Sequence, residues 1–179
     1  GVLHERCYLR AYVWNKLFRR EVLDGIRFST ELSFAEDYEM FCRVLEQCGR
    51  IVCGTKTKYY YMQRKSGVCN CGYDRTYQKA MMMFEDYCRM YSRRYPQYKK
   101  LFENHYLFDL MGMAAAMSRN GNYVAADCRK IKKYVRQKLP QYLMDKKVSL
   151  HLKGSACMIS VSVRAFGAVY RLLHGVESE

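Results

Sequence analysis

Two adjacent carboxylates, Glu36 and Asp37, stand where the sequence predicts the start of a helix over residues 33–48. At 100° per residue, Asp37 falls on the same stripe as the apolar residues Phe41 and Val44. An ionised carboxylate on a packed face costs several kcal/mol unless a cation or a pocket compensates it. Because the first turn of a helix also favours negative charge, Asp37 is a candidate general base that would accept a proton from a reacting group.

Each acid also has an explanation that involves no chemistry. Ser33 and Glu36 fit a capping box, in which two side chains satisfy backbone N–H groups at the start of a helix. A structural salt bridge to Lys16 or to an arginine is the alternative for Asp37, and the spacing leaves both interpretations open. The same dipeptide recurs at residues 85–86, in mid-helix with an arginine four residues beyond the glutamate, so the dipeptide alone is weak evidence.

The pattern of apolar residues, and with it the predicted secondary structure, changes near residue 70. Before it, a short helical pattern and the helix at 33–48 are followed by two stretches rich in β-branched and aromatic residues, "RIVCG" and "KYYYMQR", which predict two short strands. After it, the periodicity predicts helices at about 73–95, 97–119 and 123–139, which end at Pro96, Asn120-Gly121 and Pro140. The sequence therefore predicts a mixed α/β part and then an all-α part.

The amino-acid composition narrows the range of possible functions but does not identify one. The 179 residues carry a net charge of +14, which favours anionic partners. Nine scattered cysteines without CxxC pairs predict free thiols in a reducing cytoplasm. No apolar run reaches the roughly 20 residues of a membrane span, and no signal peptide opens the chain. We expect a cytoplasmic protein that is soluble or attached to the inner face of the membrane.

Three blocks of residues, in order and spacing, resemble the second half of the catalytic domain of glycosyltransferase family 2, which has the GT-A fold. The blocks are "YVWNKLFRREVLDGIRF", "AEDYEMFCRVLEQCGRI" and "KYYYMQRKSGV", and together they cover about residues 10 to 70. The resemblance implies an α/β fragment, predominantly α: the acceptor-side half of a GT-A fold over 1–70, a helical region over 71–148 and an amphipathic C-terminal helix over 149–179.

The resemblance also implies an activity, which is sugar transfer from a nucleotide-sugar donor to a hydroxyl of a glycan or lipid-linked acceptor, with inversion. Asp37 would be the base that deprotonates the acceptor, with Glu36 beside it. The other implied contacts are the acceptor side for Trp14, Asn15 and Lys16, and the donor diphosphate for Arg64. Polysaccharide or glycoconjugate synthesis would be the setting.

Two departures from the family pattern lie around the loop after the tyrosines, at Met62 and at Ser66-Gly67. A larger one is that the chain contains no Asp-X-Asp motif, which in the family holds a divalent metal, Mg²⁺ or Mn²⁺, on the sugar nucleotide. We therefore expect a C-terminal fragment that binds no metal itself and is inactive alone.

Other features have two interpretations each. Trp14, the only tryptophan, fits core filling or a sugar-stacking platform. A basic run at 129–138 precedes an apolar stripe within 153–174, which predicts one helix of about 20 residues. Its apolar face suits an anionic membrane surface or the other helices of the protein. A nonenzymatic basic module that binds nucleic acid, or an interaction scaffold, is the rival function, but no nucleic-acid motif is present and no such partner is expected.

Overall fold

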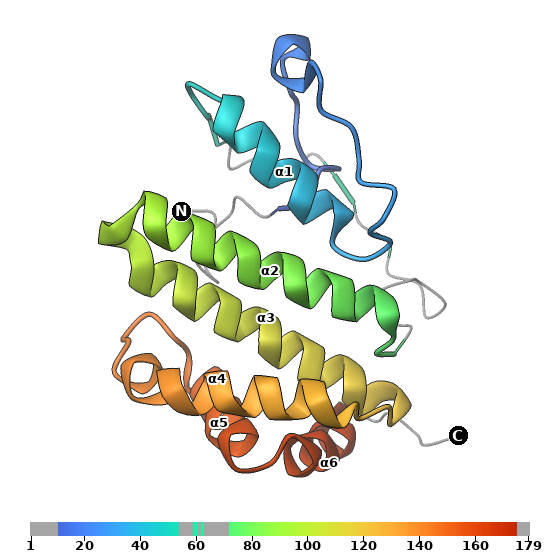
Figure 1. Cartoon of the computed structure of the whole chain (residues 1–179), viewed down its shortest axis with the longest axis vertical. Helices are drawn as coiled ribbons and strands as arrows, with labels where there is room; N and C mark the ends of the chain where they lie inside the picture. Colours follow the sequence, from blue (N-terminus) through green and yellow to red (C-terminus); the bar gives the residue numbers. More distant parts are fainter. Residues whose placement is uncertain (1–10, 54–58, 61, 63–71, 175–179) are drawn as a thin grey trace. The chain divides into compact units, whose positions relative to one another are not determined.

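The computed structural model describes residues 11–53, 59–60, 62 and 72–174. The chain divides into two compact units, residues 1–65 and 66–179. Within the described residues the structure consists of six α-helices and short 3₁₀ turns, and none of these residues is in a β-strand (Figure 1).

The expected α/β half of a GT-A fold is therefore wrong. Residues 50–53, 59, 60 and 62, the described part of the two expected strands, have no regular structure. Their apolar side chains face solvent, as the exposed fractions of 81% for Val52 and 88% for Tyr60 show. β-Branched and aromatic residues favour strands where a neighbouring strand pairs with them and one face is buried. The described residues of this segment have no such pairing strand and no buried face.

The first unit contains a 3₁₀ turn, Arg20–Leu23, and helix α1, Glu36–Gln47. Residues on one face of α1 pack on Ile26, which follows the turn, and the partly buried Phe18 and Val22 cover the cluster. The buried residues of α1 are Met40, Phe41, Cys42 and Val44. The predicted apolar stripe is thus the packed face of the helix.

Helix α1 begins differently from the capping box that the sequence predicted. The residue before the helix is Ala35, with a φ of 63°, and no side chain caps the helix there. Glu36 is the first residue of the helix, whereas a capping box with Ser33 would require it to be the third. The left-handed conformation costs a non-glycine residue about 1 kcal/mol, and this strain lies directly beside the acidic pair.

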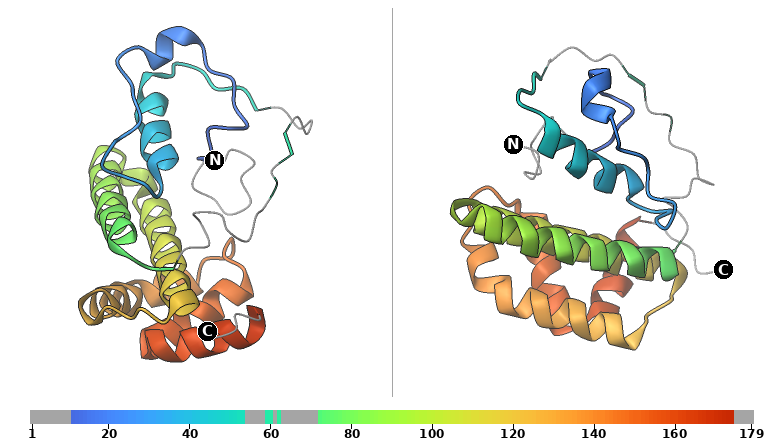
Figure 2. Two further views of the ribbon diagram at one scale, coloured as in Figure 1. Left: turned by 90° about the vertical axis from the view of Figure 1, so that its right-hand side faces the viewer. Right: turned by 45° about the horizontal axis from the view of Figure 1, so that its top comes forward.

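The second unit is a bundle in which α3 packs against every other α-helix of the unit. Figure 2 shows α2 along one side of α3, with α4, α5 and α6 on the other. The helix bounds are α2, Arg75–Arg94; α3, Lys99–Asn120, after a 3₁₀ turn at Pro96–Tyr98; α4, Ala125–Leu143; α5, Leu150–Val161; and α6, Val163–His174. Leu107, Leu110 and Met117 of α3 are fully buried. This central helix supplies the core.

Tyr73 fixes the start of the bundle and is itself completely buried. Its backbone carbonyl accepts hydrogen bonds from the side-chain amides of Asn120, at 3.1 Å, and Asn122, at 2.9 Å. Its hydroxyl donates to Asp127 at 3.0 Å. Tyr73, two residues before α2, is therefore bound to the junction of α3 and α4. Asp74 then caps α2 by accepting from two backbone N–H groups of the first turn.

The C-terminal segment forms two helices where the sequence predicted one. Ser162 is extended between α5 and α6, and its hydroxyl accepts from the backbone N–H of Ala165 at 3.2 Å, so it caps the second helix. Most of the apolar stripe that suggested a membrane surface is packed against the bundle: Ala156, Ile159, Val163 and Phe166 are buried. The exposed apolar residues of the two helices are Leu150, Val161, Val169, Leu172 and Leu173. Attachment to a membrane surface stays a prediction, and it would have to use the exposed set.

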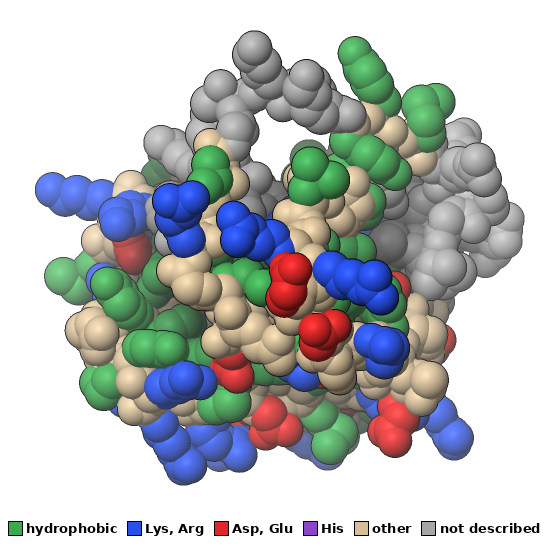
Figure 3. Space-filling model, turned by 90° about the horizontal axis from the view of Figure 1, so that it is seen from above, with side chains coloured by type: hydrophobic (Ala, Val, Ile, Leu, Met, Phe, Trp, Pro, Cys, Tyr) green, Lys and Arg blue, Asp and Glu red, His purple; other side chains and the backbone are tan. Residues whose placement is uncertain are grey.

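In the part of the chain that the structure describes, no helix is both long and apolar enough to cross a bilayer. On the face shown in Figure 3, lysines and arginines alternate with acidic side chains among the described residues. The excess of positive charge is therefore interspersed with acids on that face.

Candidate functional site

The candidate base, Asp37, lies in the first turn of α1 and is half-buried. One carboxylate oxygen accepts from the backbone N–H of Tyr38 at 2.7 Å. Burial raises the pKa of this carboxyl, the charge of Glu36 acts in the same direction, and the Tyr38 N–H and the Lys16 ammonium oppose the shift. Asp37 takes part in none of the ion pairs found among the described residues. Within the described ranges, the structure therefore does not show the salt bridge that was the alternative explanation for Asp37.

Glu39, two residues on, shows what a structural acid of the same helix looks like. Arg43 donates to both of its carboxylate oxygens at 2.7 Å and also to the backbone carbonyl of Arg27. The Glu39 side chain is only 16% exposed, so the ion pair packs along the helix. Among the described residues, Asp37 thus differs from Glu39 in forming no ion pair, as does Glu36.

Lys16 connects the Trp-Asn-Lys block to α1. Its ammonium lies 4.7 Å from the centre of the Phe41 ring, over the buried face of the helix. It donates to the side-chain oxygen of Asn15 at 2.7 Å and to the backbone carbonyl of Tyr12. Burial lowers the pKa of Lys16, and the charge of Asp37 opposes this shift. The structure therefore brings Lys16 and Asp37 within electrostatic reach of each other.

Trp14 is the middle ring of a three-ring stack. Its ring centre lies 5.0 Å from that of Tyr12, with an angle of 15° between the planes, and 4.6 Å from that of Tyr59, with an angle of 29°. The two tyrosines are 48% and 46% exposed. Trp14 is half-buried and outside the core cluster of this unit, so it does not simply fill the core. Sequence reasoning missed Tyr12, because no spacing rule relates it to Tyr59.

The remaining predicted residues are less informative. Glu36 is half-buried. Asn15 is exposed, and its side-chain oxygen accepts a hydrogen bond from Lys16. Arg64, the expected donor-diphosphate contact, lies outside the described residues. In the described ranges no three His, Cys, Asp or Glu side chains are grouped so that they could hold a metal ion. These residues do not fit the divalent metal that the resemblance implies for the intact enzyme, so no chemical step is assigned to one.

The arrangement can do two things chemically. A carboxylate of raised pKa can accept a proton from a hydroxyl more readily than an ordinary surface acid, because its charged form is partly desolvated. An exposed stack of aromatic rings can hold the apolar face of a ring-shaped ligand.

A scan against models of known protein families and searches of curated proteins and of solved structures find no match to the chain.

Proposed function

We propose that the first unit provides the acceptor-binding surface and the general base of an inverting glycosyltransferase. The observation that carries the proposal is Asp37, a half-buried acid in the first turn of α1 with a raised pKa and no ion pair among the described residues. Perturbed acids of this kind concentrate at functional sites. The similarity of the sequence blocks to glycosyltransferase family 2 adds the reaction class, and the proposal does not depend on a GT-A fold.

In the proposed reaction Asp37 takes the proton of an acceptor hydroxyl. The oxygen attacks the anomeric carbon of the donor sugar as the bond from that carbon to the diphosphate oxygen breaks. The diphosphate leaves with the electron pair, and the configuration at the carbon is inverted. A base placed in this way contributes about a hundred- to ten-thousand-fold to the rate.

The aromatic stack supplies the acceptor surface in this proposal. Sugar rings present C–H groups on their faces, and these groups pack on aromatic rings. Tyr12, Trp14 and Tyr59 together offer more ring surface than one side chain does, which suits an oligosaccharide. Lys16 lies two residues from Trp14 and is within electrostatic reach of Asp37, so the surface and the base belong to one unit.

Binding of saccharides tests the acceptor surface directly on this chain. Because Trp14 is the only tryptophan, its fluorescence reports on the stack alone. Titration with a panel of neutral and acidic oligosaccharides should change the emission with at least one of them, and Tyr59→Ala should weaken that binding. Tyr60→Ala, at an 88% exposed neighbour, is the control. No response to any saccharide, or equal losses in both variants, would refute the acceptor surface.

Catalysis tests the base. In an enzyme that joins this chain to a nucleotide-sugar-binding domain, Asp37→Asn should lower turnover by about a hundredfold or more while the Kd for the donor stays the same. Asp86→Asn, in the second Glu-Asp dipeptide, is the matched control because that side chain is 74% exposed. Near-normal turnover of Asp37→Asn would eliminate this residue as the base.

A further inference from the structure

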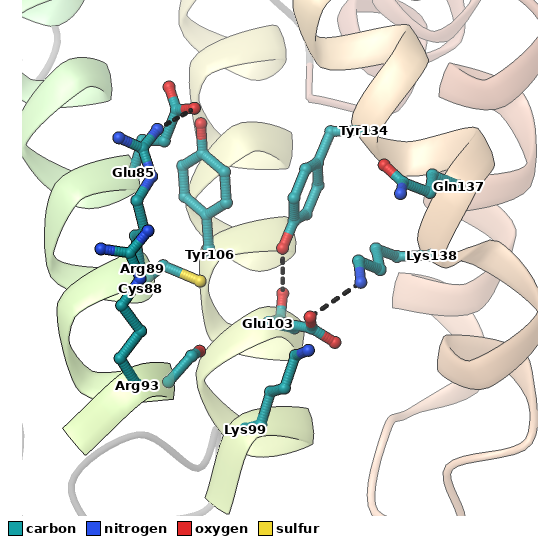
Figure 4. A pocket seen from close by; sticks show the side chains of 11 residues that line it. Glu85, Cys88, Arg89, Arg93, Lys99, Glu103, Tyr106, Tyr134, Gln137 and Lys138 are labelled. Carbon is teal, nitrogen blue, oxygen red and sulfur yellow. Dashed lines mark hydrogen bonds and ion pairs between the residues drawn. The ribbon is translucent and has the colours of Figure 1, made fainter. Parts of the chain in front are cut away.

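A cavity of about 340 Å³ lies in the helical unit and takes no part in the proposed sugar transfer. It is lined by side chains from α2, α3 and α4, which converge on it in Figure 4. Its volume is in the range of small-molecule sites and is much larger than one water molecule needs. Most of the residues that line it are polar or charged, and their aliphatic and aromatic parts contribute apolar surface beside these groups.

The acids of the cavity already have partners. Glu103 accepts from Lys138 at 2.7 Å and from Gln141 at 3.1 Å, and its side chain is 11% exposed. Burial opposes ionisation of this carboxyl, but these two hydrogen bonds outweigh it and lower its pKa. Glu85 is held by Lys130 at 2.5 Å and by Arg89 at 3.0 Å. Both carboxylates are therefore neutralised from within the protein.

Two cations of the lining form no ion pair among the described residues, although the charge of one of them, Lys99, acts on Glu103. They are Arg93, in the last turn of α2, and Lys99, the first residue of α3. Figure 4 shows Arg89 and Arg93 along one wall and Lys99 at the lower end of the cavity. Arginine and lysine together are the usual side chains for phosphate, because a guanidinium donates in pairs and an ammonium adds a compact charge.

The uncharged groups of the cavity add donors without adding negative charge. Burial raises the pKa of the Cys88 thiol and of the Tyr106 and Tyr134 hydroxyls, so all three stay protonated at neutral pH. The two tyrosine rings meet edge to face with centres 4.7 Å apart and form an aromatic wall. The buried hydroxyl of Ser92 finds no hydrogen-bonding partner of regular geometry within the described part of the chain.

From this arrangement we infer that the cavity between α2, α3 and α4 binds a phosphorylated small molecule, whose phosphate lies against Arg93 and Lys99 and whose organic part lies against Tyr106 and Tyr134. The inference does not rest on the proposed sugar transfer, because all of these residues lie in the helical unit and none belongs to the candidate site. The competing explanation is that Arg93 only interacts favourably with the C-terminal end of α2. That explanation predicts no ligand.

Inorganic pyrophosphate is the probe, titrated calorimetrically into the whole chain in 50 mM salt. We expect one saturable site, and Arg93→Gln/Lys99→Gln should weaken binding at least tenfold. The control is Arg75→Gln/Lys100→Gln, which removes the same charge at exposed positions of the same two helices outside the cavity. It should change the affinity less than twofold.

Three outcomes would overturn the inference. One is the absence of a saturable site, and another is equal weakening by both double variants, which would show a diffuse effect of net charge. The third is citrate binding as tightly as pyrophosphate, which would show no preference for phosphate. Arg93 and Lys99 are exposed at the rim, so the variants are expected to fold, and an unchanged circular dichroism spectrum verifies this.

Discussion

Trp14 stacks on Tyr59 with their ring centres 4.6 Å apart, which joins two distant parts of the first unit. A contact of this kind contributes about 0.5–1.5 kcal/mol beyond the area that it buries. Tyr59→Ala should therefore lower the free energy of unfolding by roughly this amount and expose Trp14, so that its emission shifts to longer wavelength. Tyr60→Ala should change neither. An unshifted emission maximum in Tyr59→Ala would show that the stack does not form in solution.

Asp37→Asn should make the first unit slightly more stable at neutral pH. The folded pKa of Asp37 is raised, so the folded state binds this proton more tightly than the unfolded state, and ionisation costs stability as the pH rises above the ordinary carboxyl pKa of about 3.9. Asparagine removes this cost, and because solvent screens the site we expect a rise in Tm on the order of 1 °C. The gain should disappear well below pH 3.9, where the acid is protonated in both states.

Glu39→Gln in the same helix should instead lower the Tm at neutral pH, because Glu39 is paired with Arg43. Melting curves of the two variants at pH 7 and at low pH provide the comparison. Equal and negative shifts in both would mean that Asp37 has a stabilising partner, which would contradict its proposed availability as a base.

Lys138→Met should destabilise the helical unit by about 3 kcal/mol at pH 7, because it leaves Glu103 buried and ionised without its cation. The pKa of Glu103 is lowered in the folded state, so the stability from its ionisation is present above the ordinary carboxyl pKa and is lost as the pH falls through the folded value. The penalty should shrink accordingly in acid. Arg89→Met, at a pair whose side chains are 55% and 33% exposed, should cost less than about 1 kcal/mol in urea titrations.

Replacement of glycine by alanine should have opposite effects on stability at Gly167 and at Gly154. A Cβ at Gly167 would lie 2.0 Å from the Tyr123 hydroxyl oxygen and 2.6 Å from Ser118 Oγ, so Gly167→Ala should cost about 2 kcal/mol through overpacking. A Cβ at Gly154 meets nothing within 4 Å, and Gly154→Ala should stabilise α5 by up to about 1 kcal/mol. Chemical denaturation measures both. A neutral Gly167→Ala would show that α6 does not pack this closely.

The helices were predictable because their signal is local. Helices α1 to α4 appear within a few residues of the expected ranges, since apolar periodicity and capping are properties of short segments. Pro140 was wrongly expected to end α4, which continues to Leu143. It lies near the end of the helix, so its missing N–H removes only one of the last hydrogen bonds. At Ser162 the expected single C-terminal helix is interrupted, because its hydroxyl caps a new helix. A serine side chain can favour either a cap or a continued helix, and the sequence alone does not show which of the two is more stable.

The features that could not be predicted from the sequence depend on contacts between residues that are distant in the chain. The strands were wrong because β-propensity describes a fit to neighbouring strands, and the residues around Val52 and Tyr60 have none among the described residues. Asp37 was found from its place on a helix, which is local information, whereas the partners of Trp14 were not. The cavity was missed altogether, because its lining comes from three helices and follows no spacing rule.

The binding of Tyr73 to the turn between α3 and α4 has a consequence for dissecting the protein. Both polar groups of this residue, the main-chain carbonyl and the phenol, form hydrogen bonds to the bundle. A separately expressed helical domain should therefore include Tyr73. A recombinant piece starting at Arg75 would retain helices α2 to α6 but would leave the side-chain amides of Asn120 and Asn122 without their carbonyl acceptor, at the junction that closes the bundle. Asp127 would keep its bond from Gln78 but lose the one from the Tyr73 hydroxyl.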